Sequence, residues 1–121
     1  MRSGLVVLVV EDHDRIRKAE AEALSRFGYD VLTAANAEEA LQLLTDSRVD
    51  LLITDIRLPG RLHGIALARA VKQSWPNVKI VIVSFGLDQF ALKDLRTLAD
   101  GVLTKPFKLS ELEERVANLI G

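Results

Sequence analysis

Five short apolar runs alternate along the chain with five segments of helical periodicity, and this alternation is the strongest constraint on the fold. The runs are rich in β-branched residues and stop at polar or turn residues, which is typical of buried strands. They are Leu5–Val10, Tyr29–Ala34, Leu51–Asp55, Lys79–Val83 and Gly101–Thr104. Strands that alternate with helices predict a parallel sheet covered by helices on both faces, with right-handed crossovers.

The segments between these runs carry apolar residues at spacings of three and four, as amphipathic helices do. We predict helices from about 14 to 27, after Asn36, from 65 to 74, within 88–98, and from Ser110 onward. Gly28 is expected to end the first helix, and Asn36 with Glu39 is expected to form a capping box at the second. The third helix should end near Trp75 because the following proline disfavours helix at that residue.

The 121 residues, 49% of them hydrophobic, predict one domain, which we assign to residues 1–121. The predicted fold is α/β: a flavodoxin-like, doubly wound, five-stranded parallel sheet of order 2-1-3-4-5 with five helices, one of the two common solutions for this pattern. Its switch point lies between the first and third strands, and open sheets of this kind bind ligands there.

Composition excludes several classes of site and partner. A net charge of -1 gives no electrostatic footprint for nucleic acid or for an acidic membrane. The absence of cysteine excludes disulfides and thiolate metal sites. The run Leu5–Val10 is far shorter than the ~18–20 residues that span a bilayer. We therefore expect a cytoplasmic protein that contacts neither nucleic acid nor membrane directly.

Polar residues stand at the ends of four predicted strands. Glu11 and Asp12 follow the first strand and Asp55 ends the third. These strands are neighbours in the predicted order, so their three carboxylates should share one crevice. Ser84 and Lys105 end the fourth and fifth strands at the same edge of the sheet. The sequence therefore predicts a single polar pocket at the carboxyl edge.

Three carboxylates in a partly desolvated pocket must take up protons or bind a cation. Oxygen ligands favour a hard ion, and Mg²⁺ is the simplest choice because it retains waters and bridges to phosphate. A carboxylate beside Mg²⁺ can attack phosphorus and form an aspartyl-phosphate. Lys105 and Ser84 can contact phosphoryl oxygens. These parts predict that Asp55 accepts a phosphoryl group.

Each residue also has a purely structural interpretation. A single acid after a strand is more often a helix cap or a turn residue, and Asp12 or Asp14 could cap the first helix. Lys105 alone could be a surface lysine and Ser84 a turn residue. The coincidence of four strand ends favours a functional site. We assign structural roles to the remaining candidates: solvated loop positions for His13 and His63, helix-end packing for Trp75, and a strand position facing away from the pocket for Thr104.

Four motifs occur in a specific order and spacing along the chain. They are Val9-Val10-Glu11-Asp12, Thr54-Asp55-Ile56-Arg57-Leu58-Pro59-Gly60, Val81-Ile82-Val83-Ser84 and Leu103-Thr104-Lys105-Pro106-Phe107. Each motif alone is weak, but together they are highly specific. Over essentially its whole length the chain resembles a response-regulator receiver domain of two-component signalling.

The resemblance implies that Asp55 accepts the phosphoryl group from the phosphohistidine of a sensor histidine kinase or a histidine phosphotransfer protein. It implies that the side chains of Asp12 and Asp55 and the backbone carbonyl of Arg57 hold Mg²⁺, with Glu11 helping mainly through water. Ser84 and Lys105 would bind the phosphoryl group, and the Lys105–Pro106 peptide bond would be cis. Such a domain catalyses only its own phosphorylation and dephosphorylation.

Three features depart from the usual pattern of this family. An aromatic residue usually stands three positions before the lysine, where this chain has Val102, and valine cannot make the aromatic rotamer switch. The residue after the switch serine is usually small, but here it is Phe85. The loop from Pro59 to Gly64 is one residue longer than the commonest pattern. None of these changes removes a residue that the phosphorylation chemistry needs.

The predicted output is a two-state surface made by the fourth helix, the fifth strand and the fifth helix, biased by the phosphate charge. Phe90, Leu92 and Leu95 are candidates for that surface, although helical spacing places some of them in the core. A downstream effector protein or a second copy of the chain would bind there. The sequence contains no DNA-binding module before it ends at Gly121, so we expect either a stand-alone receiver or a receiver cut from a longer chain.

Two other functional classes stay open from sequence. A Mg²⁺-dependent phosphohydrolase would need a general acid/base near the nucleophile and a substrate cap, and the sequence provides neither. A constitutive protein-docking module would keep the fold without the phosphorylation switch, and Val102 and Phe85 favour it. Such a module would bind its partner equally well with Asp55→Asn.

Overall fold

The computed structural model describes residues 4–60, 63–85 and 92–121, with the side chains of all of these except 85 and 92–94. The strands are β1 (Val6–Val10), β2 (Asp30–Ala34), β3 (Leu51–Asp55), β4 (Lys79–Phe85) and β5 (Gly101–Lys105). The helices are α1 (Asp14–Arg26), α2 (Ala37–Asp46), α3 (Gly64–Ser74), α4 (Leu92–Leu98) and α5 (Leu109–Ile120).

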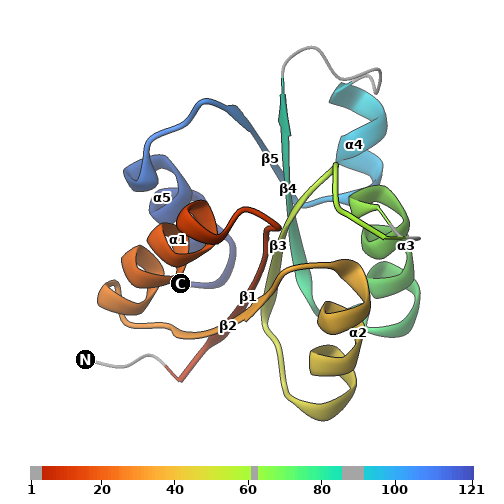
Figure 1. Ribbon diagram of the computed structural model, residues 1–121, viewed down its shortest axis with the longest axis horizontal. Coiled ribbons are helices and arrows are strands. Elements are labelled where there is room, and N and C mark those ends of the chain that lie inside the picture. Colours follow the sequence, from red (N-terminus) through yellow and green to blue (C-terminus); the bar gives the residue numbers. More distant parts are fainter. Residues whose placement is uncertain (1–3, 61–62, 86–91) are drawn as a thin grey trace.

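The strands form one parallel sheet in the order β2-β1-β3-β4-β5, which confirms the predicted fold class and strand order. Helices α1 and α5 cover one face of the sheet, and α2, α3 and α4 cover the other (Figure 1). The central position of β3, between β1 and β4, explains why its residues Leu51–Thr54 are all buried. No helix in residues 4–60, 63–85 and 92–121 is long and apolar enough to cross a membrane.

The strands divide the core into two layers, because successive side chains point to opposite faces of a sheet. Val7, Val9 and Ile53 belong to the layer under α1 and α5, together with Leu24 and Leu112. The even-numbered neighbours of these strand residues belong to the larger layer under α2, α3 and α4. That layer includes Leu8, Val10, Leu52, Ile80, Ile82, Ala40, Val71 and Leu95.

Helix α2 begins as the sequence predicts, with one difference in its cap. Asn36 accepts a hydrogen bond from the backbone N–H of Glu39 at 2.8 Å. The Glu39 carboxylate accepts from the N–H of Ala35 at 3.1 Å, so the predicted return bond to Asn36 is shifted by one residue. The Glu39 N–H is one of the amides that the first turn of a helix leaves without intrahelical partners, and the Ala35 bond ties the preceding residue to that turn.

The structure corrects several predicted boundaries and burial assignments. β4 runs through Phe85, so Ser84 lies inside the strand rather than after its end. Leu95 is 2% exposed and belongs to the core, not to the predicted output surface. The predicted surface residue Phe90 and the side chain of Leu92 lie outside the described part of the chain.

Helix α1 differs most from its predicted apolar stripe. Its buried residues are Glu20, Ala23 and Leu24, whereas Ile16 is 37% exposed and Phe27 is 51% exposed. Phe27 lies at the end of the helix and stacks on Tyr29, with ring centroids 5.8 Å apart. The helix therefore buries one acidic residue against the sheet and exposes apolar residues near its ends.

Gly64, the first residue of α3, lies directly against the end of β3. A methyl group built on its Cα would stand 1.8 Å from the backbone carbonyl oxygen of Asp55, well inside van der Waals contact. The Gly64 N–H also donates to the Ile56 carbonyl at 2.8 Å. Only glycine fits this approach, which connects the start of α3 to the backbone of Asp55.

We therefore expect Gly64→Ala to lower the free energy of unfolding by roughly 2–4 kcal/mol, because backbone must move to admit the methyl group. Gly101→Ala is the control, since its added methyl would meet only the side chain of Arg115, at 3.2 Å. Urea denaturation of both variants measures the difference. Equal effects of the two substitutions would show that the approach of Gly64 to Asp55 is not a constraint.

Candidate functional site

Three strands deliver charged side chains to the same face of the sheet. Glu11, Asp55 and Lys105 each come two residues after a strand residue of the core layer under α1 and α5. Because strand side chains alternate with a period of two, all three project toward that side at the carboxyl edge. The convergence predicted from strand ends is therefore built into the alternation of β1, β3 and β5.

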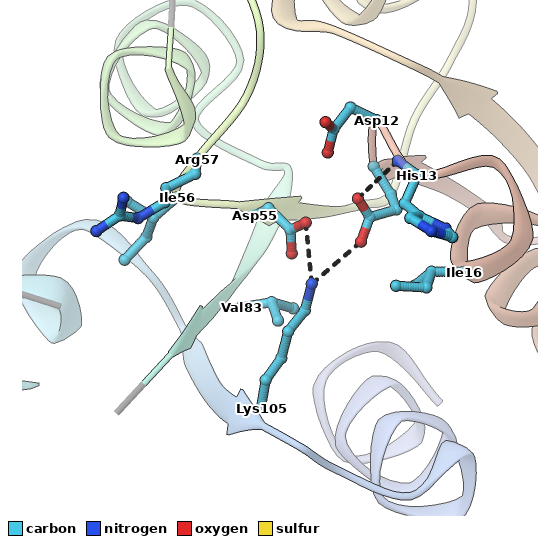
Figure 2. A pocket seen from close by; sticks show the side chains of 9 residues that line it. Asp12, His13, Ile16, Asp55, Ile56, Arg57, Val83 and Lys105 are labelled. Carbon is cyan, nitrogen blue, oxygen red and sulfur yellow. Dashed lines mark hydrogen bonds and ion pairs between the residues drawn. The ribbon is translucent and has the colours of Figure 1, made fainter. Parts of the chain in front are cut away.

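These side chains line a cavity with a volume of about 280 Å³ at the carboxyl edge of the sheet (Figure 2). Its lining residues are Glu11, Asp12, His13, Ile16, Asp55, Ile56, Arg57, Val83 and Lys105. Ser84 is buried and is not one of them, because β4 presents the preceding residue, Val83, to the cavity. The structure thus joins the predicted acids and lysine in one pocket and places Ser84 behind its wall.

Lys105 pairs with two of the acids. Its Nζ atom lies 3.2 Å from Glu11 Oε1 and 3.2 Å from Asp55 Oδ2 (Figure 2). The side chains are 16%, 3% and 12% exposed, so the ion pairs are largely shielded from water. One ammonium group therefore faces two buried carboxylates, with Asp12 beside them.

Glu11 is held from several directions. Its backbone N–H donates to the Ala34 carbonyl of the neighbouring strand at 3.0 Å. Its Oε2 atom accepts from the backbone N–H of His13 at 3.1 Å. Arg17 donates to the backbone carbonyl of Glu11 at 2.9 Å and to the carboxylate of Asp14 at 2.5 Å. The loop that carries Glu11 and Asp12 is therefore fixed by both backbone and side-chain bonds.

The excess of negative charge changes the proton affinity of the acids. Burial, hydrogen bonding to Glu11 and repulsion by Glu11 raise the pKa of Asp55 to about 8. Burial and the same neighbour raise the pKa of Asp12. Burial also opposes the charge on Glu11, but hydrogen bonds from Asp55 and from His13 N–H, with the charge of Lys105, lower its pKa. Glu11 therefore holds the negative charge, and Asp55 shares a proton with it in the absence of a cation.

Burial tends to lower the pKa of Lys105, but the charges of Asp55 and Glu11 outweigh burial and raise it. Lys105 therefore stays protonated in the cavity. The one positive charge of Lys105 cannot balance the negative charges of Glu11, Asp12 and Asp55 when all three are ionised.

The donor set fits a divalent cation with oxygen ligands. One carboxylate oxygen from each of Glu11, Asp12 and Asp55 lies within 4.8 Å of the others. All three donors are hard oxygen atoms, which suits Mg²⁺ better than a soft metal. Arg57 also lines the cavity, and its side chain extends away from the carboxylates (Figure 2).

The backbone of Asp55 is fixed on several sides. The hydroxyl of buried Thr54 donates to the Asp55 carbonyl at 2.9 Å. Ile56 N–H donates to the Val83 carbonyl at 3.1 Å, and Gly64 closes over the same peptide. The Asp55 carboxylate is therefore carried by a strand end whose backbone is hydrogen-bonded and tightly packed, rather than by a loose loop.

The structural interpretations of single residues can now be decided. The N-cap residue of α1 is His13, whose side chain makes no capping hydrogen bond, so neither Asp12 nor Asp14 occupies the cap position. His63 caps α3 by accepting from the Ala66 N–H at 3.4 Å, while His13 is an exposed residue at the mouth of the cavity. As expected, Trp75 packs at the end of α3 and Thr104 is exposed on β5.

Two residues near the site were not predicted. Glu20 is 4% exposed on α1, and burial with repulsion from Glu11 raises its pKa to about 7. Its position four residues from both Ile16 and Leu24 is the sequence signal that places it on the inner face. Arg17 was missed because an arginine among other charged residues of α1 has no distinguishing pattern.

Of the three departures from the family pattern, the structure describes the side chain of Val102 only. Val102 is half-buried on β5 and packs against the larger core layer. Its carbonyl accepts a hydrogen bond from Arg115 of α5 at 2.9 Å. The Lys105–Pro106 peptide bond is cis, as the resemblance implied. The side chain of Phe85 and residues 61–62 of the longer loop lie outside the described part of the chain.

Comparison with known proteins identifies relatives over nearly the whole chain. The model of the response regulator receiver domain family matches residues 7–117. The phosphate regulon transcriptional regulatory protein PhoB of Pseudomonas aeruginosa is 36% identical over 116 residues, which cover 93% of this chain and 50% of that protein. The uncharacterized transcriptional regulatory protein YrkP of Bacillus subtilis is 41% identical, with 91% of this chain and 47% of YrkP covered. This chain spans about half the length of these relatives.

Solved structures agree with the fold. The response regulator TrrA of Thermotoga maritima, in complex with Mg²⁺-BeF, is similar with a TM-score of 0.84 and 33% identity, covering 96% of this chain and 99% of that one. A receiver domain protein from Clostridium thermocellum gives a TM-score of 0.87 at 28% identity, covering 96% of this chain and 94% of that one.

The crowded acids predict an unusual effect of neutralising Asp55. We expect Asp55→Asn to raise the free energy of unfolding by roughly 1–3 kcal/mol in a chelator at about pH 8, because it removes a buried charge beside Glu11 and Asp12. The control is Glu22→Gln, which neutralises an exposed acid of α1. Equal or lower stability of Asp55→Asn would show that the three carboxylates do not repel one another in one pocket.

The same variant should flatten the dependence of stability on pH. The pKa of Asp55 is about 8 in the folded protein against an ordinary 3.8, so the folded state binds the extra proton between these values. The free energy of unfolding of the wild type in a chelator should therefore fall as pH rises from about 5 to 8. Urea denaturation at several pH values should show a smaller fall for Asp55→Asn, with a residual slope from Glu20. A wild-type stability that rises over this range would contradict the assignment.

Proposed function

The chain belongs to the response regulator receiver domain family, and on that basis we propose that Asp55 accepts a phosphoryl group from a phosphohistidine. The donor would be a sensor histidine kinase or a histidine phosphotransfer protein. The observation that supports this most is the cavity at the carboxyl edge, where Asp55 lies beside two further acids and the ammonium of Lys105.

Glu11, Asp12 and Asp55 would hold Mg²⁺ through their carboxylates, together with the backbone carbonyl of Arg57. When bound, Mg²⁺ supplies positive charge that favours the ionised form of Asp55 and neutralises the phosphoryl oxygens. The close grouping of three carboxylate oxygens supports this assignment. Glu11, which is anchored by His13 N–H and by Lys105, is the acid best fixed to remain charged.

In the transfer step a carboxylate oxygen of Asp55 attacks phosphorus while the bond from phosphorus to the donor's imidazole nitrogen breaks. The imidazole leaves with the electron pair of that bond and takes up a proton from water. Lys105 then exchanges its contact with Asp55 for a phosphoryl oxygen, which keeps a charge-assisted hydrogen bond throughout. Its buried stem limits how far the ammonium can move from the reacting atoms.

Ser84 is the proposed switch residue. It lies within β4 directly after Val83, a residue of the cavity wall. A hydrogen bond from its hydroxyl to a phosphoryl oxygen requires local rearrangement of this strand end. That movement of β4 would couple phosphorylation at Asp55 to a two-state surface.

The proposed output surface is formed by α4, β5 and α5, where a downstream effector protein or a second copy of the chain would bind. Arg115 crosses from α5 to the carbonyl of Val102 and couples α5 to β5. We propose no direct contact of this surface with nucleic acid or membrane and a cytoplasmic location, in keeping with the net charge of -1.

A second candidate function is supported by Val102. A half-buried valine on β5 replaces the aromatic switch that the family resemblance led us to expect, so a constitutive docking module without phosphorylation switching has a specific argument in its favour. The two candidates differ in whether Asp55 is modified. They make different predictions for labelling with a small phosphoryl donor.

We expect incubation with Mg²⁺ and acetyl phosphate to add a single phosphate to the wild type, seen as a mass increase by intact mass spectrometry. The adduct should require Mg²⁺ and should be absent from Asp55→Asn, because that variant lacks the attacking carboxylate. Asp46→Asn, which changes an exposed aspartate at the end of α2, is the matched control and should be labelled normally.

Beryllofluoride, a stable mimic of the phosphoryl group, distinguishes rapid loss of phosphate from failure to react. Binding of beryllofluoride without a detectable adduct would indicate a short-lived phosphate. If the wild type is not labelled and does not bind beryllofluoride, phosphoryl acceptance is rejected, and the constitutive docking module becomes the proposed function.

A further inference from the structure

A groove lies beside the phosphoacceptor cavity, between α1 and the segment that leads from β5 into α5. Its volume is about 510 Å³. Apolar side chains of Ile16, Ala19, Pro106, Phe107 and Leu109 form most of its lining. Ile16 and Leu109 are each 37% exposed, so apolar surface is open to solvent at its rim. We call this feature the Glu20 groove, after the acid that also lines it.

Glu20 is the anomalous residue of the groove. Its side chain is almost fully buried, with 4% of the residue exposed. No residue in 4–60, 63–85 and 92–121 donates a hydrogen bond to its carboxylate or forms an ion pair with it. Every side-chain polar atom that is fully enclosed in this part of the chain does have a partner. The unpartnered carboxylate of Glu20 is therefore not fully enclosed, and it opens into the groove that it lines.

The charged groups near Glu20 do not neutralise it. Glu11 repels it, and the attraction of Lys105 is already shared with Glu11 and Asp55 at 3.2 Å. Arg15 lies at the exposed rim of the groove without an ion pair to Glu20 in the described residues. Burial first, and then Glu11, raise the pKa of Glu20 to about 7. The groove thus combines apolar walls with one acid that forms no ion pair with any cation among the described residues, although the charge of Lys105 acts on it at a distance.

The groove is continuous with the phosphoacceptor cavity, because Ile16 and Lys105 line both. A protein that brings a phosphohistidine to Asp55 must cover the mouth of the cavity, including exposed Ile16. Such a donor therefore places its neighbouring residues over the Glu20 groove. A small donor such as acetyl phosphate would not reach it.

We propose that Glu20 is a specificity-determining residue that selects phosphodonor proteins presenting a lysine or arginine next to the phosphohistidine. The apolar stem of such a side chain packs on Ile16, Phe107 and Leu109 while its cationic head meets the Glu20 carboxylate. Neutral or acidic residues at that position of the donor leave the carboxylate buried without a partner, which disfavours the complex. This inference rests on the proposed function, since it assigns the groove to the phosphodonor.

The test uses two helix-forming peptides as probes. One presents a single lysine flanked by leucines on one face, and its twin has norleucine in place of the lysine, which keeps the stem and removes the charge. Titration into isotopically labelled wild-type protein, followed by backbone amide shifts of Ile16, Ala19 and Leu109, gives the Kd for each peptide. We expect the lysine peptide to bind at least about ten-fold more tightly, the scale of a charged hydrogen bond.

The preference should disappear in Glu20→Gln, which keeps the shape of the side chain, and persist in Glu22→Gln, an exposed acid of the same helix. Equal affinity of the two peptides for the wild type, or an unchanged preference in Glu20→Gln, would overturn the inference. So would shifts caused by free hexylamine without any by the lysine peptide, because the groove would then be a site for small amines.

The failure of this inference can be distinguished from failure of the proposed function. If wild-type Asp55 is labelled by acetyl phosphate but the lysine peptide shows no preference, only the role of Glu20 is wrong. If the wild type is neither labelled nor bound by beryllofluoride, phosphoryl acceptance fails, and the role of Glu20 in donor selection fails with it.

Discussion

The ion pairs of Lys105 with Glu11 and Asp55 are the interaction on which the site depends. One ammonium group faces two buried carboxylates at 3.2 Å each, and Asp12 adds a third acid nearby. This arrangement is not neutral, so the cavity takes up either a proton on Asp55 or a cation. The surplus of negative charge is therefore the property that suits the cavity to a divalent cation and distinguishes it from a balanced structural salt bridge.

Backbone contacts hold these like-charged residues close together. Glu11 follows β1, and Asp55 and Lys105 end β3 and β5. The residue two positions before each of them is buried in the layer under α1 and α5. Gly64 and Thr54 fix the carbonyl of Asp55, and Arg17 fixes that of Glu11. Because these contacts hold the backbone in place, the acids stay close together. A bound cation would relieve the repulsion between their carboxylates, and this relief favours its binding.

Strand order and the convergence of Glu11, Asp55 and Lys105 could be predicted because both follow from local signals: β-branched runs, polar residues at their ends and one standard topology. Ser84 shows the limit of this reasoning. Its place at a predicted strand end did not reveal that β4 continues and turns Val83 toward the cavity. The spacing of Glu20 along α1 puts it on the inner face, but this signal does not establish burial, since an acid in a charged helix is usually solvated and only tertiary packing encloses it.

Proton release on binding of Mg²⁺ tests most directly whether the three acids form one under-compensated site. Titration calorimetry at pH 7 in two buffers of different ionisation enthalpy gives the number of protons released per bound ion. Because the pKa of Asp55 is about 8 before the cation binds, the account predicts release of about one proton by the wild type and markedly less by Asp55→Asn. Binding of Mg²⁺ to the wild type without proton release would contradict the claim that Asp55 shares the charge of Glu11 and Asp12.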